Sequence, residues 1–282
     1  MILFKECEVY KPERVGARDV LVAGTRIVAI EEEIPEPRGV RVRVVEGRGR
    51  RLIPGLIDCH VHIAGAGGEG GPATRTPELT LSQMLEAGVT AVVGCLGTDG
   101  ITRTVESVLC KAKALRQEGV SCWIYTGSYQ VPTPTILGDV ARDLALIDEV
   151  VGVGEIALSD HRSSGPSVDD LIRLAAQARV GGLLGGKGGI VNFHMGNARD
   201  PFRPLYEIVE RSELTLRQFL PTHCARNAHI LEEAKSYGRD GFVDITASAY
   251  PFFPEHEIKP SKAVGELLEA GVPLDHITMT SD

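Results

Sequence analysis

The feature that most constrains the fold of this chain is a repeated unit that begins near residue 52. Short apolar runs typical of strands alternate there with amphipathic segments typical of helices, at roughly thirty residues per unit. Alternating strands and helices imply parallel strands, and eight such units predict an α/β fold, a (β/α)8 TIM barrel. The eight strand-like runs are residues 52–62, 90–97, 121–129, 150–160, 189–196, 214–224, 242–250 and 276–282, with seven helical segments between them.

Two of the helical segments carry clear local signals. Ser167 precedes the acidic pair Asp169 and Asp170 and an apolar residue, which is typical of a helix N-cap followed by an acidic first turn. In the segment between the second and third strands, the apolar residues recur with helical spacing on one face. These are Val105, Val108, Leu109, Ala112 and Leu115.

The first fifty residues have a different pattern. The β-branched runs at residues 19–30 and 40–45 are separated by Gly and Pro and indicate strands of a small sheet. We therefore expect a small β-sandwich-like domain at 1–51 and a barrel at 52–282. Because the sequence stops at the eighth strand, we also expect a barrel without its last helix and a lower stability than that of a longer form.

Composition narrows the class of protein. The chain has 282 residues, with 30 basic residues against 38 acidic ones and a net charge of −8, which disfavours a nucleic-acid partner. No apolar run approaches a membrane span, and the four-residue run at the start is too short for a signal peptide, so we expect a cytoplasmic protein without a membrane partner. The six cysteines form no C-x-x-C pair, which indicates neither a zinc ribbon nor a disulfide framework.

In a (β/α)8 barrel, chemistry takes place where strands end and the following loops begin. The first strand ends in Asp58-Cys-His-Val-His62, and the period of two places His60 and His62 on one face and Cys59 on the other. Two adjacent imidazoles can hold one metal ion, and the opposite face excludes Cys59 as a ligand. An H-x-H pattern is by itself a weak signal, and its alternative is a pair of ordinary polar residues.

Further candidate ligands stand at the matching ends of later strands. The fifth strand ends with His194, the sixth with His223 and the eighth with Asp282. Each has an ordinary alternative, a hydrogen-bonded histidine or a helix-capping aspartate. Their joint occurrence at one end of the barrel indicates a metal site, and four imidazoles with a carboxylate suit zinc.

Glu155 is a charged residue inside the otherwise apolar fourth strand. Burying a carboxylate without a partner is costly, so a metal ion is an attractive explanation for it. We interpret Glu155 as the anion that bridges two metal ions. The alternative is that Glu155 pairs with an arginine such as Arg162.

With these residues in place, the chain resembles the amidohydrolase superfamily, whose opening signature is similar to PGLIDCHVH at residues 54–62. Over essentially its whole length it is similar to the bacterial β-aspartyl (isoaspartyl) dipeptidase family. The stretches that carry this resemblance are GGEGGP (67–72), GCLGTD (94–99), TGSY (126–129), LSDHRS (158–163), RVGGLLGGK (179–187), FHMG (193–196) and PTH (221–223).

The resemblance implies roles for the candidate residues. His60 and His62 would hold one zinc ion and His194 and His223 the other, and Asp282 would bind the first zinc and move the proton. A metal-bridging hydroxide would attack the scissile amide of an isoaspartyl dipeptide, and Tyr129 would polarise the carbonyl. The remaining implied contacts to the dipeptide are Glu69 to its α-amino group, Gly67 and Thr98 nearby, and Arg162 and Arg226 to a carboxylate. The family also implies a homo-oligomer, an octamer.

This sequence departs from the family in two respects. The family continues past the eighth strand with C-terminal strands that complete the small β domain, so the resemblance implies an incomplete small domain here. The other departure lies in the centre. The family's bridging residue is a carbamylated lysine, and the aligned residue here is Glu155. Three alternatives to an isoaspartyl dipeptidase stay open: an N-acyl amino acid deacylase, a cyclic amidase, and a non-catalytic truncated scaffold. A scaffold would bind no stoichiometric zinc, and a panel of substrates separates the enzymes.

Overall fold

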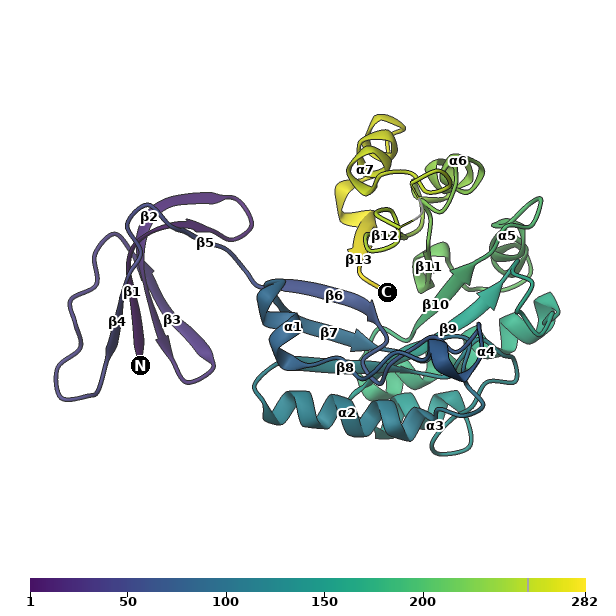
Figure 1. The fold of residues 1–282 in the computed structure, drawn as a ribbon, viewed down its shortest axis with the longest axis horizontal. Coiled ribbons are helices and arrows are strands. Elements are labelled where there is room, and N and C mark those ends of the chain that lie inside the picture. Colours follow the sequence, from purple (N-terminus) through teal and green to yellow (C-terminus); the bar gives the residue numbers. More distant parts are fainter. Residues whose placement is uncertain (253) are drawn as a thin grey trace. The chain divides into compact units, whose positions relative to one another are not determined.

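The computed structural model describes residues 1–252 and 254–282 and divides into two compact units, Met1–Leu56 and Ile57–Asp282 (Figure 1). The division falls at the start of the first barrel strand. The sequence-based boundary, after residue 51, stays a prediction. Among the described helices, none has the length and apolarity needed to cross a bilayer.

The smaller unit is one sheet of five strands. They are β1 (Ile2–Tyr10), β2 (Arg14–Ala23), β3 (Arg26–Glu31), β4 (Arg43–Glu46) and β5 (Arg51–Leu52). Strands β1, β2 and β3 are antiparallel neighbours, while β4 and β5 both pair in parallel with β1. A small cluster of buried side chains, Cys7, Val9 and Val20, forms its core.

The structure differs from the sequence-based expectation in two details of this unit. The run at residues 19–30 is a hairpin, because Gly24 adopts a positive φ of 59° and turns the chain between β2 and β3. Strand β1 was not predicted. It buries alternate residues such as Leu3, Cys7 and Val9 while charged residues lie between them, so its apolar run is short.

The larger unit alternates eight strands with seven α-helices among its described residues, which confirms the (β/α)8 prediction. The strands are β6 (Leu56–Val61), β7 (Val89–Gly94), β8 (Ser121–Thr126), β9 (Val150–Leu158), β10 (Ile190–Met195), β11 (Phe219–Thr222), β12 (Val243–Thr246) and β13 (Ile277–Thr280). The helices are α1 (Leu81–Glu86), α2 (Val105–Gln117), α3 (Val140–Leu146), α4 (Val168–Gly185), α5 (Arg203–Glu210), α6 (Ala228–Tyr237) and α7 (Pro260–Glu269), with short 3-10 turns at Pro72–Thr74, Leu216–Gln218 and Leu274–His276.

Strand pairing runs in chain order. Six parallel strands from β6 to β11 form one sheet, and β12 and β13 form a second, parallel pair. The two sheets meet at two junctions, here called seams. At the first seam, between β11 and β12, Cys224 N–H donates to Asp244 O at 3.0 Å. At the second seam, between β13 and β6, Asp282 N–H donates to His60 O at 3.0 Å. Figure 1 shows the chain passing from β6 through β10 to β13, whose end returns to β6. The carboxyl ends of the first and last strands are therefore neighbours.

A polar cluster fills the interior beside the first seam. The Asp244 carboxylate is fully buried and accepts hydrogen bonds of 2.6 Å from the hydroxyls of Thr222, Thr278 and Thr280. These three threonines come from β11 and β13, on either side of β12. The buried charge is thus hydrogen-bonded, as such groups must be, and it links strands that lack a continuous ladder.

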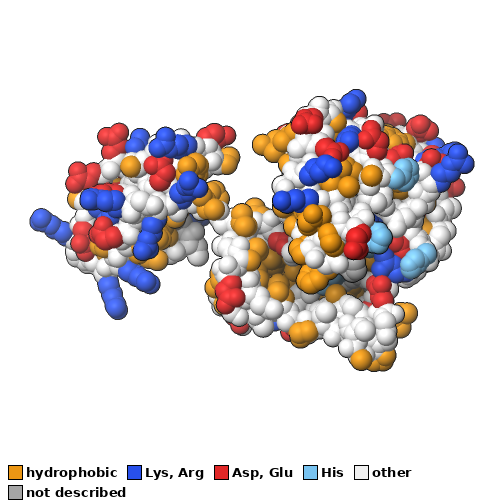
Figure 2. Space-filling view, turned by 45° about the horizontal axis from the view of Figure 1, so that its top comes forward, with side chains coloured by type: hydrophobic (Ala, Val, Ile, Leu, Met, Phe, Trp, Pro, Cys, Tyr) orange, Lys and Arg blue, Asp and Glu red, His pale blue; other side chains and the backbone are white. Residues whose placement is uncertain are grey.

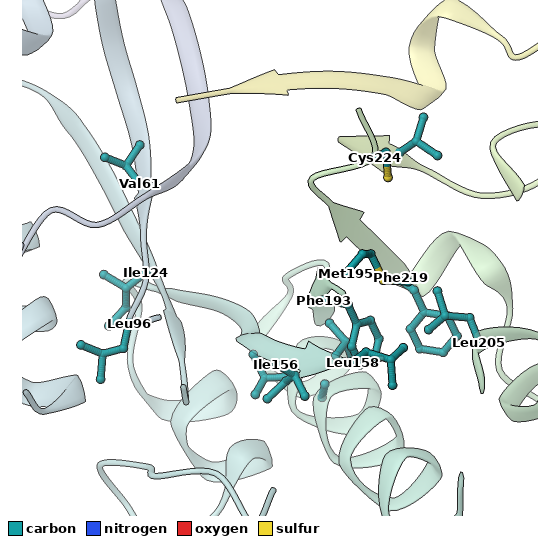
Figure 3. Packing of buried hydrophobic residues seen from close by; sticks show 14 of the residues in the cluster. Val61, Leu96, Ile124, Ile156, Leu158, Phe193, Met195, Leu205, Phe219 and Cys224 are labelled. Atoms are coloured by element: carbon teal, nitrogen blue, oxygen red, sulfur yellow. The ribbon is translucent and has the colours of Figure 1, made fainter. Parts of the chain in front are cut away.

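Alternation along the strands separates the apolar core from the barrel interior. On β9, Ile156 and Leu158 are buried, and on β10 Phe193 and Met195 are buried in register with them. Figure 3 shows these side chains packed with Phe219 and Leu205. Each such burial stabilises the fold by about 1.5–3 kcal/mol. The intervening residues of the same strands therefore face the barrel interior.

The structure confirms the local helix predictions. In α2 the buried residues are Val105, Val108, Ala112 and Leu115. Ser167 caps α4 in a capping box with Asp170. The glycine-rich end of α4 has a packing role: a side chain at Gly181 would meet the backbone of Ala141 in α3 at 2.7 Å. The RVGGLLGGK stretch therefore permits close contact between two helices.

Candidate metal centre

His60 and His62, called here the first pair, project from the end of β6. His60 is fully buried and His62 is 13% exposed. Their rings lie 5.5 Å apart, centroid to centroid, and both Nε2 atoms face the same carboxylate. Cys59 belongs to none of the metal-type clusters of the described residues, and burial raises the pKa of its thiol to about 12. The prediction that His60 and His62 lie on one face of the strand and Cys59 on the other is therefore confirmed.

His194 and His223, the second pair, come from two neighbouring strand ends. His194 lies in β10, and His223 follows β11 with a left-handed φ of 64°. The Nδ1 atom of His223 lies 2.6 Å from the hydroxyl oxygen of Thr246. Burial, with His194 as a neighbour, lowers the pKa of His223 to about 4. His223 is therefore a neutral imidazole near pH 7, which is the form that binds metal ions.

Glu155 lies between the two pairs. Its Oε2 atom is 3.2 Å from His60 Nε2 and 3.6 Å from His62 Nε2. Its Oε1 atom is 3.2 Å from His223 Nε2 and also contacts His194 Nδ1. Burial would raise the pKa of this carboxyl, but His60 and His194 hold it well below its usual range. One charged carboxylate thus presents a separate oxygen to each pair of histidines.

Asp282 completes the group on the side of the first pair. Its Oδ1 atom lies 3.0 Å from His62 Nε2 and 3.4 Å from His60 Nε2. The backbone N–H of Ser281, the residue before Asp282, donates to the Asp58 carboxylate at 3.1 Å. This hydrogen bond fixes the end of β13 to β6. The Asp282 side chain remains one third exposed, at 33%.

The chemistry of these donors fits metal ions. In the described residues, Nδ1 and Nε2 of His60 and Oε2 of Glu155 are buried without a hydrogen-bond partner. Leaving several buried polar atoms unpaired is costly, and a cation bound between His60 Nε2 and Glu155 Oε2, which lie 3.2 Å apart, would remove part of that cost. The side chains form three overlapping clusters: His60, His62, Cys95 and Glu155; His60, His223 and Asp282; and Glu155, His194 and His223. Each cluster could hold an ion.

Cys95 is a member of one cluster that the sequence prediction did not include. It is fully buried after β7, and its sulfur lies 3.7 Å from His62 Nδ1. Its position in the GCLGTD stretch, at the carboxyl end of the second strand, was the signal that could have found it. The sulfur contacts Nδ1 of His62, whereas the carboxylates of Glu155 and Asp282 face Nε2 of that ring.

A cavity of about 280 Å³ opens next to the centre and brings together the predicted substrate contacts. It is lined by Gly67, Glu69, Thr98, Tyr129, Arg162 and Arg226, together with His62, His194 and Asp282. Figure 2 shows histidine side chains on one face of the larger unit, beside acidic and basic ones. All eight histidines of the sequence lie at or after residue 60.

Tyr129 joins the cavity to the second pair. Its hydroxyl lies 2.7 Å from His194 Nδ1, and the Arg162 guanidinium carbon lies 5.2 Å from its ring centroid. Burial raises the pKa of Tyr129 well above its ordinary value. The phenol is therefore protonated at neutral pH and can donate a hydrogen bond.

Arg162 pairs with acids other than Glu155. Its Nη1 atom lies 2.9 and 3.0 Å from the two oxygens of Glu69, which the hydroxyl of Thr98 also contacts. Its Nε and Nη2 atoms bind the two oxygens of Asp160 at 2.9 and 3.0 Å. The alternative in which Glu155 pairs with Arg162 is therefore wrong.

Asp160 is a residue of the site that sequence reasoning missed. Its side chain is 6% exposed and lies 3.4 Å from His194 Nε2 and 3.7 Å from Arg226 Nη1. Burial would raise its pKa, but hydrogen bonds from His194 and Arg162 hold it far below the usual range. The available signal was its place in LSDHRS, two residues before Arg162 and just past a strand end.

Comparisons with known proteins agree with this geometry. A scan against protein-family models found no match. The crystal structure of β-aspartyl dipeptidase from Fervidobacterium islandicum AW-1, in complex with a β-Asp-Leu dipeptide, superposes with a TM-score of 0.91 at 43% identity. The superposition covers 100% of this chain and 73% of that one.

Curated relatives match over shorter stretches. Adenine deaminase from Deinococcus radiodurans is 36% identical over 94 residues, which are 33% of this chain and 16% of that protein. Dihydroorotase from Pediococcus pentosaceus is 24% identical over 185 residues, which are 64% of this chain and 40% of that protein. The chain thus spans less than half the length of these curated relatives.

The barrel, its strand-end histidines and these likenesses define the class: the chain is a member of the amidohydrolase superfamily. Within that superfamily, the chain belongs to the β-aspartyl dipeptidase family, since it is 43% identical to the Fervidobacterium enzyme over its whole length.

Proposed function

We propose that this chain hydrolyses the β-aspartyl bond of isoaspartyl dipeptides and that it holds two zinc ions. The observation that carries the proposal is the position of Glu155, which offers one oxygen to each histidine pair beside a cavity lined by Arg162, Arg226 and Glu69. Metal dependence also fits the superfamily, whose members are metal-dependent, and side chains of this chain form clusters that could hold an ion.

The ligands divide between two ions. We assign His60, His62 and Asp282 to the first ion and His194 and His223 to the second, with Glu155 bridging them. Nitrogen and carboxylate donors are the ligands that zinc takes in proteins. Bound there, the ions would lower the pKa of a water molecule so that hydroxide is available near neutral pH.

Two side chains of the protein act on the proton and the carbonyl. The Asp282 carboxylate, partly exposed to the cavity, takes the proton of the attacking water and delivers it to the leaving amine. The Tyr129 hydroxyl, kept protonated by burial, donates a hydrogen bond to the oxygen on which negative charge develops.

The cavity matches the charges of a dipeptide with free ends. We assign Glu69 to the substrate's α-ammonium group, with Gly67 and Thr98 beside it, and Arg162 and Arg226 to a carboxylate. The planar guanidinium group suits a carboxylate because it can donate two parallel hydrogen bonds. An N-acylated substrate would leave Glu69 without a cationic partner.

The test is a matched pair of substrates with metal analysis of the same sample. We expect cleavage of β-Asp-Leu, little cleavage of α-Asp-Leu, and about two zinc ions per chain if both ligand sets are filled. Cleavage of N-acetyl-β-Asp-Leu at the rate of the free dipeptide would instead favour a deacylase. A protein that holds no stoichiometric zinc would support the scaffold alternative.

The assembly and location implied by the resemblance stay predictions. We expect a homo-oligomer, an octamer by family resemblance, in the cytoplasm and with no nucleic-acid partner. Light scattering on the purified protein measures the number of subunits.

A further inference from the structure

Asp160 is one carboxylate in contact with three other functional groups. Its Oδ1 atom accepts from Arg162 N at 2.8 Å and from Arg162 Nε at 2.9 Å. Its Oδ2 atom accepts from Arg162 Nη2 at 3.0 Å and lies 3.4 Å from His194 Nε2 and 3.7 Å from Arg226 Nη1. The two arginines of the cavity and a histidine of the metal centre therefore meet at this side chain.

The chain fixes Asp160 through the ends of β9 and β10. Ser159 adopts a left-handed φ of 57°, which is uncommon for a residue other than glycine, and its hydroxyl donates to Pro201 O at 2.9 Å. Gly196 lies against this turn: a Cβ there would lie 2.2 Å from Ser159 O and 2.3 Å from Asp160 Cα. The LSDHRS and FHMG stretches therefore pack closely because residue 196 has no side chain.

The two nitrogens of His194 face different surroundings. Nδ1 faces Glu155 and Tyr129, on the side of the metal centre. Nε2 lies 2.7 Å from Arg162 Nη2 and 3.2 Å from Arg226 Nη2, and these groups can only donate hydrogen bonds. When Nδ1 binds a metal ion, the ring proton must sit on Nε2, where it would point at two cations. Among the described residues, the acceptors within reach of Nε2 are the Asp160 carboxylate at 3.4 Å and the Tyr129 hydroxyl at 3.5 Å, and of these two only the carboxylate is an anion.

We propose that Asp160 is a positioning residue that accepts the Nε2 proton of His194 and holds the two guanidinium groups in place, and so couples the second metal position to the substrate's carboxylate contact. The coupling to substrate rests on the proposed function, whereas the orientation of His194 does not. Carboxylates that accept from a metal-bound histidine typically contribute 10- to 100-fold to metal affinity.

The experiment compares Asp160→Asn with Asp169→Asn. Asp169 makes an exposed ion pair with Arg211 and provides a control of the same chemistry away from the site. We expect Asp160→Asn to lower zinc affinity about 10- to 100-fold in a chelator titration and to raise KM for β-Asp-Leu. Asp169→Asn should match the wild type in both measurements. Wild-type zinc affinity in Asp160→Asn would overturn the proposal.

A second variant covers the case in which Asp160→Asn does not fold. Gly196→Ala keeps the Asp160 carboxylate but displaces it, so zinc affinity should fall and KM should rise in this variant as well. Wild-type values in a folded Gly196→Ala protein would count against the proposal. If the wild type binds zinc but cleaves no isoaspartyl dipeptide, the proposed function fails, and the zinc titrations still decide whether Asp160 orients His194.

Discussion

The two histidine pairs of the metal centre have different surroundings. His60, of the first pair, makes no hydrogen bond with either ring nitrogen among the described residues. In the second pair, His194 contacts Tyr129, Arg162 and Arg226. The first pair therefore has neighbours suited mainly to holding an ion, while the second pair also touches groups that we assign to the substrate. Substitutions beside the first pair should therefore change mainly zinc binding and turnover, whereas substitutions beside the second pair should also change KM.

The largest expected effect is that of Asp282→Asn. Asp282 contacts the first pair and is the proposed proton carrier, so its loss removes transition-state stabilisation. We predict that turnover falls by about 10²- to 10⁴-fold, with little change in KM and at most partial loss of zinc. Steady-state kinetics with metal analysis checks this. Near-normal turnover would show that another group moves the proton.

The next largest effect should be that of Glu155→Gln, which removes the charge shared by both pairs. We predict a zinc content below that of the wild type and a large loss of activity, because the amide cannot bridge as an anion. The wild-type apoprotein should recover activity with zinc alone in buffer stripped of carbon dioxide, since a glutamate is already charged at neutral pH. Added formate should restore part of the activity of Glu155→Ala.

Two results would contradict the role of Glu155. One is a requirement for bicarbonate during reconstitution of the wild type, which would indicate a carbamylated lysine. The other is a Glu155→Gln variant with two zinc ions and normal turnover.

An intermediate effect is expected on the substrate side of the second pair. Arg226→Lys keeps a positive charge but loses the planar fork, and a charge-assisted hydrogen bond contributes roughly 1.5–3 kcal/mol. We predict a rise in KM of about 10- to 100-fold with zinc content unchanged. Arg211→Lys, at the surface pair with Asp169, is the matched control and should leave KM unaltered. An unchanged KM in Arg226→Lys would remove Arg226 from the substrate contacts.

The smallest effect should come from Thr246→Val, next to His223. The variant loses one hydrogen bond to the imidazole, a change of about 0.5–1.5 kcal/mol, so zinc affinity should fall by roughly tenfold or less. Thr278→Val loses a part-buried hydrogen bond of the same length, 2.6 Å, to Asp244. That control should lower the melting temperature without changing zinc affinity, and equal zinc loss in both variants would indicate a general destabilisation.

The sequence was sufficient to predict the barrel and the positions of the histidines. Period-two alternation placed His60 and His62 on one face, and the apolar character of β9 made Glu155 stand out. The predicted facing of His60 and His62 is confirmed because it depends on the repeat within a single element, whereas the bridging role of Glu155 stays a prediction. The helix predictions succeeded for the same reason, as with the buried face of α2.

The strand-end position of Asp160 was visible in the sequence, but its contacts could not be predicted because they depend on residues from separate loops. Its direction is set by the left-handed Ser159 and by the absence of a side chain at Gly196, neither of which follows from a periodic pattern. The ion pair between Arg162 and Glu69 could not be predicted either, because the two residues are 93 positions apart in the chain. Strand β1 was missed because charged residues alternate with its buried ones, so that it has few consecutive apolar residues although it pairs on both sides in the small sheet.

The ion pair between Glu69 and Arg162 has a consequence for selectivity. A ligand with a single charge that enters the cavity breaks this pair and gains one ion pair in return, so the exchange yields little. A zwitterion whose two charges reach both side chains breaks the same pair and gains two. Intramolecular partners compete at a high effective concentration. We therefore expect acetate, ammonium and other simple ions to displace the Glu69–Arg162 pair poorly, and the proposed dipeptide substrate, with two charges, to displace it best.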